Sequence, residues 1–187
     1  MTMHVPALRS VRVSQAIAYH FGFDHGWAIF TVNDATGELN LQSDWGDYAY
    51  RWPARPESLG AENLTAFLVN ARADSDYVAR KLFGGDTTEF DADATAEALR
   101  DVIVSRRRKN EIDRDVARAA WDELARWGPS SYDDFHNTPD EISEALYQSA
   151  YEYARTCSTG RFLFVRDFLI PLFVDHLRTP TVAQEAA

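Results

Sequence analysis

One stretch of ten residues, from Ser43 to Trp52, most constrains how this chain can fold. It reads Ser-Asp-Trp-Gly-Asp-Tyr-Ala-Tyr-Arg-Trp and contains four aromatic side chains. In a β-strand, successive side chains point to opposite faces of the sheet. A strand here therefore carries an aromatic face, which consists of Tyr48, Tyr50 and Trp52. The opposite face carries Asp47, Ala49 and Arg51. Such an aromatic row is either a wall of the hydrophobic core or a binding surface, and alternation alone leaves both open.

The rest of the first third of the chain also has the pattern of strands. Apolar residues alternate loosely from Arg9 to His20 and continue from Trp27 to Val32. Between the second strand and a short third strand at Leu39 and Leu41 lies Asn33-Asp34-Ala35-Thr36-Gly37. Asn and Asp bond their own backbone in turns, and Gly supplies a positive φ, so this segment predicts a hairpin. Together the segments predict an antiparallel meander of three or four strands.

After Pro53 the spacing of apolar residues changes to that of helices. The predicted helices cover approximately 61–70, 75–83, 91–108, 112–127, 138–155 and 161–178. The third helix starts with Asp91 or Asp93 as its cap, and the pair Asp113 and Asp115 stands where the fourth helix starts. Helix N-termini favour negative charge, so capping explains both pairs. Thr138, Pro139 and Glu141 have the pattern of a capping box at the start of the fifth helix. The last helix is apolar almost all round, so we expect it to be the most buried, with a kink at Pro171.

These elements predict an α+β fold in which five or six helices pack on one face of the sheet. A length of 187 residues is typical of one domain. The sequence therefore predicts a single domain over 1–187, β-rich at 9–52 and helical at 61–178.

The charge of the chain argues against several classes of partner. The formal net charge is −10 and the isoelectric point is about 4.9. Direct binding to nucleic acid or to anionic membranes is disfavoured, because attraction to phosphates requires a basic surface. The N-terminus shows no signal-peptide pattern, and the apolar stretch 162–177 is too short and too charged to span a bilayer. With Cys157 as the only cysteine, we expect a cytoplasmic protein without disulfides.

No catalytic or cofactor motif is present in the sequence. The chain lacks a Gly-x-Ser-x-Gly elbow, a Gly-x-Gly-x-x-Gly loop and a phosphate-binding Gly-x-x-x-x-Gly-Lys-Ser/Thr loop. No two of its five histidines have the i, i+4 spacing of a helical zinc pair. We therefore predict no catalytic residue, no metal site and no cofactor, while an enzyme site assembled only in space remains an alternative.

Acidic side chains on the predicted helices are the first candidates for a binding surface. Spaced carboxylates can imitate a phosphate backbone and bind a basic protein surface, although ordinary solvated helices look similar. The candidates are Asp113, Asp115, Asp122, Glu123, Asp133, Asp134, Asp140 and Glu144, together with Arg51 beside the aromatic strand.

A basic run, Arg106-Arg107-Arg108-Lys109, closes the predicted helix 91–108. Cations at a helix C-terminus complement the helix dipole, so a solvated last turn explains the run. The alternative is a small docking patch for an anion.

The stretch from Ser43 to Trp52 resembles the signature strand of a family of small proteins encoded by bacteriophages and prophages. In that family the strand precedes a Phe-Leu helix, here Phe67-Leu68. A second helix with Asp-Tyr-x-x-x-Lys-Leu follows, here Asp76 to Leu82. The likeness covers about Trp27 to Trp127. It implies a phage accessory protein that acts inside a bacterium, and it implies no catalytic residue.

Three classes of function follow from these observations. The first is a non-catalytic protein that binds and inhibits a host protein or nucleoprotein complex, for example an anti-CRISPR-like or other anti-defence factor. The second is an enzyme whose site is not visible in the sequence. The third is a structural phage protein, with a homo-oligomer left open for all three.

Overall fold

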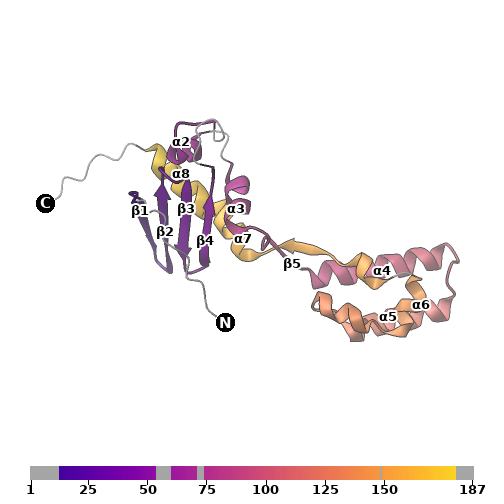
Figure 1. The fold of residues 1–187 in the computed structure, drawn as a ribbon. Coiled ribbons are helices and arrows are strands. Elements are labelled where there is room, and N and C mark those ends of the chain that lie inside the picture. The colour runs from indigo at the N-terminus through magenta and orange to yellow at the C-terminus, as the bar shows by residue number, and fades with distance from the viewer. Residues whose placement is uncertain (1–12, 54–59, 71–73, 148, 180–187) are drawn as a thin grey trace, which may run out of the picture. The chain divides into compact units, whose positions relative to one another are not determined.

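The computed structural model describes residues 13–53, 60–70, 74–147 and 149–179 (Figure 1). It divides into two compact units. We call Met1–Gly85 with Gly160–Ala187 the sheet unit, and Asp86–Thr159 the helical unit. The helical unit is thus a continuous insertion in the sequence of the sheet unit. None of the described helices is both long and apolar enough to cross a membrane.

The sheet unit contains the predicted meander. Its four antiparallel strands lie in chain order: β1 (Ile17–Phe23), β2 (Gly26–Asn33), β3 (Glu38–Ser43) and β4 (Gly46–Arg51). The prediction for the first strand was wrong in its limits. Residues 9–12 lie outside the described residues, 13–16 are not in a strand, and pairing with β2 continues to Phe23. The cause is the tight turn at Asp24 and His25, which lets Phe23 pair with Gly26.

The turn between β2 and β3 forms as its residues predict. The side-chain oxygen of Asn33 accepts a hydrogen bond from the Thr36 amide at 3.2 Å. Gly37 has a φ of 71°, which glycine adopts without steric cost. These two local features set the register in which Asn33 pairs with Glu38.

Helices cover one face of the four-stranded sheet (Figure 1). They are α2 (Leu64–Val69), α3 (Ser75–Phe83), α7 (Gly160–Phe164), the π-helical turn η3 (Val165–Leu169) and α8 (Ile170–Arg178). Phe173 of α8 stacks on Phe30 of β2 with ring centroids 4.2 Å apart, and both are fully buried. The segment 160–178 buries one face rather than all sides, through Phe162, Val165, Leu169, Ile170, Phe173 and Val174. Its other face is open, and Phe168 there is 44% exposed.

Pro171 does not end the last helix. The Ile170 amide donates to the Val165 carbonyl, five residues earlier, in a wide turn just before the proline. Such a π turn relieves the clash between a proline ring and the preceding carbonyls, and it tolerates the missing N–H. The kink predicted at Pro171 stays a prediction, and the feature found next to the proline is the π turn.

The aromatic row of β4 is a wall of the core. Trp52, just beyond β4, is 3% exposed, and Tyr48 stacks on Phe83 of α3 with ring centroids 4.0 Å apart. The alternate residues Asp47, Ala49 and Arg51 are exposed. Alternation predicted the two faces correctly, and the helices decide which face is inside.

The helical unit starts and ends in a two-stranded antiparallel ribbon. Its elements are β5 (Thr88–Phe90), α4 (Ala92–Arg108), α5 (Arg114–Trp127), the 3-10 turn η1 (Tyr132–Asn137), α6 (Asp140–Leu146), the 3-10 turn η2 (Ala150–Tyr153) and β6 (Thr156–Ser158). Asp91 caps α4 by accepting the Ala94 amide. Buried Thr95 accepts the Arg155 amide at 2.9 Å, which holds the start of α4 against the chain that leads into β6. Helices α4, α5 and α6 pack around a hydrophobic core of their own, separate from that of the sheet unit.

The predicted helix over 138–155 was wrong in its length. Helix α6 ends at Leu146, where Tyr147 turns the chain with a φ of 53°. The predicted capping box is absent, since the Thr138 hydroxyl donates to the Phe135 carbonyl instead. The α+β fold class is confirmed, whereas the single domain over 1–187 stays a prediction.

Candidate functional site

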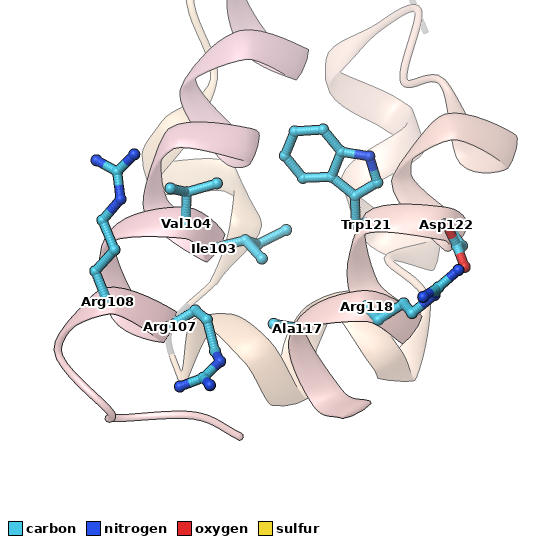
Figure 2. Close-up of a pocket in the computed structure, with 8 residues that line it drawn as sticks. All are labelled: Ile103, Val104, Arg107, Arg108, Ala117, Arg118, Trp121 and Asp122. Carbon is cyan, nitrogen blue, oxygen red and sulfur yellow. The ribbon is translucent and has the colours of Figure 1, made fainter. Parts of the chain in front are cut away.

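A groove of about 590 Å³ opens between α4 and α5 of the helical unit (Figure 2). Its lining residues come from these two helices alone: Ile103, Val104, Arg107, Arg108, Ala117, Arg118, Trp121 and Asp122. Its size is in the range of sites that bind small molecules or single anchor side chains.

The floor of the groove is apolar because α5 has more apolar surface than the core of the helical unit covers. Ala120 and Leu124 of α5 are buried with Ile142 of α6 in that core. Ala117 and Trp121 form a second stripe, three residues before Ala120 and Leu124, and this stripe lines the groove. Trp121 remains 43% exposed. No residue of α6 lines the groove, so this apolar stripe of α5 is left uncovered by α6.

Arginines form the rim of the groove. Figure 2 shows Arg107 and Arg108 on its α4 side, and Arg118 beside Asp122 on its α5 side. The Arg118–Asp122 pair is long, at 3.9 Å, and both side chains are exposed. Arg107 donates to the side-chain oxygen of Asn110, and neither Arg107 nor Arg108 forms an ion pair with any residue the structure describes. The rim therefore presents cations that can bind an anion.

A smaller hollow of about 270 Å³ shares Arg107 with the groove. Its lining comes from the end of α4, the loop that follows it and the start of α5: Arg107, Asn110, Glu111, Ile112, Asp113 and Arg114. Glu111 and Asp113 bring negative charge close to the basic rim.

Several of the predicted binding carboxylates have local structural roles. Asp113 caps α5, because its side chain accepts the amides of Asp115 and Val116, both at 2.9 Å. Asp134 accepts the amides of Ser130 and Ser131 at the start of η1.

Two further candidates form ion pairs within α5. Asp122 lies near Arg118, and Glu123 pairs with Arg126 at 2.9 Å. The other four acidic candidates are exposed and form no ion pair with a described residue: Asp115, Asp133, Asp140 and Glu144. Of these, Asp140 and Glu144 are four residues apart on α6 and therefore share a helix face.

Arg51 lies in the sheet unit, apart in sequence from every acidic candidate. It is exposed, and its Nε donates to the Thr36 carbonyl at 3.1 Å. Among the described residues it forms no ion pair with Asp47. The bond to Thr36 ties the end of β4 to the turn that precedes β3.

The hydrogen bonds to Asp134 lower the pKa of its carboxyl group, first through the Ser130 amide and then through the Ser131 amide and the Ser130 hydroxyl. A lowered pKa means that the ionised group stabilises the fold above the unfolded-state pKa of about 3.9. This stabilisation is lost as the pH falls through the lower folded-state pKa.

We therefore expect Asp134→Ala to lower the melting temperature at about pH 7, and the difference from the wild type to shrink towards zero at about pH 2. Thermal unfolding followed by circular dichroism at both pH values measures it. A difference that is the same at both pH values would show that Asp134 acts by packing and not by charge.

The sequence pointed to only part of this groove. Arg107 and Arg108 were identified within the basic run, but the floor beside them was missed. The signal was Ala117 and Trp121, which are four residues apart and lie next to the core stripe of α5. Among the described residues, no group of three or more His, Cys, Asp or Glu side chains is placed to hold a metal ion.

Comparison with models of protein families gives a match. A model of a phage family, Phage_phiTE_072, matches residues 7–168, which is most of the chain. Neither the curated proteins nor the solved structures contain a match. The match confirms the expectation of a phage-encoded family, and the role of the Ser43–Trp52 stretch as its signature stays a prediction. The chain therefore belongs to this phage family.

Proposed function

We propose that this phage protein is a non-catalytic accessory factor that binds and inhibits a basic protein or nucleoprotein complex of the host. Such a factor would act against a host defence system, as an anti-CRISPR-like protein or another anti-defence protein does. The observation that supports the proposal is the set of exposed carboxylates on the helical unit that have no ion pair with a described residue: Asp115, Asp133, Asp140 and Glu144.

The physical argument is electrostatic. A chain with a net charge of −10 attracts a basic partner over a distance, and complementary charge raises the association rate more than it slows dissociation. Carboxylates that cap helices or pair with arginines contribute less, because their charge is already partly compensated. Asp140 and Glu144 on one face of α6 are therefore the first choice for a test.

The experiment is capture of the partner from a lysate of the host, its identification, and measurement of association rates with the purified partner. We expect Asp140→Lys with Glu144→Lys to lower the association rate about tenfold at low salt, with less effect at high salt. The matched control is Asp24→Lys with Asp47→Lys. Both residues are exposed in the sheet unit, and the change in net charge is the same.

Three results would contradict the proposal. Equal effects of the two double variants would show that only net charge matters. Tight binding to duplex DNA in the presence of competitor would make nucleic acid the partner. Turnover of a substrate, abolished by one substitution in a pocket, would make the protein an enzyme.

A further inference from the structure

The α4–α5 groove is lined by three arginines and one aspartate, so it is basic, whereas the chain as a whole is acidic. The basic residues of 86–159 concentrate between Arg100 and Arg118, although the chain as a whole is acidic. The groove combines these cations with an apolar floor that includes an exposed tryptophan. The carboxylate contact in the proposed function involves neither these arginines nor the apolar floor.

We infer that this groove binds an amphipathic helical segment of a partner protein, which carries an apolar anchor side chain beside carboxylates. The inference does not rest on the proposed contact through Asp140 and Glu144. A groove between two helices suits the binding mode in which a third helix lays its apolar face between them.

The floor accounts for the anchor. Val104 and Ala117 offer partly exposed aliphatic surface above the buried Ile103, and Trp121 closes one side of it (Figure 2). The Arg100 guanidinium lies 5.9 Å from the centre of the Trp121 ring, a distance at which a cation interacts with the ring face. An apolar side chain that enters the groove gains contact with these groups and leaves water.

The rim accounts for the carboxylates. Arginine binds a carboxylate through two parallel hydrogen bonds, which give orientation as well as attraction. Arg108 has no ion pair to break among the described residues, and Arg118 has only the long contact with Asp122. A carboxylate next to the anchor can therefore bind without displacing a strong internal pair.

The same charges argue against a nucleic acid in the groove. A nucleic acid strand is longer than the groove, so its phosphates would also lie next to residues outside it. Charges at this surface interact within a screening length of about 8 Å at physiological ionic strength. Asp122 lines the groove, and Glu111 and Asp113 line the adjoining hollow. A chain of phosphates would meet these carboxylates, whereas a short peptide need contact only the arginines.

Fluorescence anisotropy with the full chain tests the inference. The probe is a fluorescein-labelled helical peptide of about 20 residues, because isolated helices shorter than about 15 residues are only marginally stable in water. It carries Leu and Phe along one face and Glu elsewhere. A second peptide has Lys in place of each Glu, and the third probe is a labelled oligothymidine. We expect the acidic peptide to bind and the basic peptide to bind at least about tenfold more weakly.

Two variants locate the binding. Arg108→Glu should weaken binding of the acidic peptide about tenfold or more, while Arg161→Glu should change it less than about twofold. Arg161 is a fair control because it is exposed in the sheet unit and forms no ion pair with a described residue. Trp121→Ala should also weaken binding. Circular dichroism shows whether the Trp121→Ala variant is folded. If that variant unfolds, the result with Arg108→Glu still decides the test.

The inference is overturned by equal affinity for the acidic and basic peptides, by equal effects of Arg108→Glu and Arg161→Glu, or by no saturable binding of the acidic peptide. Tighter binding of the oligothymidine would assign the groove to nucleic acid and overturn it as well. The Asp140→Lys, Glu144→Lys variant should leave the peptide affinity unchanged, so the groove and the carboxylate contact can fail independently.

Discussion

Trp52→Ala should lower the free energy of unfolding of the sheet unit by about 3–5 kcal/mol, the usual cost of removing a large buried aromatic side chain. Trp52 is 3% exposed, and its ring packs near Phe67, with centroids 5.9 Å apart. Its indole N–H donates to the Tyr77 hydroxyl at 3.3 Å. Alanine would leave a cavity between the end of β4 and the helices. Urea unfolding followed by far-UV circular dichroism measures the change.

Trp27→Ala is the matched control. It removes the same kind of side chain from the same sheet, but Trp27 is 42% exposed. We expect a loss of about 1 kcal/mol or less there, as for most surface substitutions. Equal losses at the two positions would show that the aromatic face of β4 is no better buried than the outer face.

Leu124→Ala should destabilise the helical unit by about 2–5 kcal/mol. Leu124 is 1% exposed and belongs to a hydrophobic cluster with Ile142 and Leu146 that is separate from the core of the sheet unit. Because the two cores are separate, we expect faster amide hydrogen exchange in 92–146 and unchanged exchange in 26–51. Mass spectrometry of the exchanged peptides measures both regions.

Leu39→Ala is the reciprocal test, since Leu39 is fully buried in the core of the sheet unit. It should speed exchange in 26–51 and leave 92–146 unchanged. Faster exchange everywhere with both variants would instead support the single cooperative domain that the sequence predicts.

The proposed carboxylate contact and the groove give the helical unit two binding features of opposite charge. A partner that uses both would need a basic surface and an acidic amphipathic segment. The double variant on α6 and Arg108→Glu on α4 separate the two contributions, because they change different elements.

The sequence by itself determined the features that depend on neighbouring residues. The turn at Asn33 and Gly37 and the alternation along β4 formed as predicted. Aspartates cap α4 and α5 where the sequence placed acidic pairs, and the structure selects Asp91 and Asp113 from those pairs. Hydrogen bonds across two or three residues and the two-residue repeat of a strand require no knowledge of distant parts of the chain.

Only the tertiary structure decided what those elements touch. It placed the aromatic face of β4 against α3, and it ended α6 at Leu146, well short of the predicted helix. It also revealed the groove, because a stripe such as Ala117 and Trp121 looks like core until the neighbouring helices leave it uncovered. Burial depends on contacts between residues far apart in sequence, and one-dimensional spacing does not contain them.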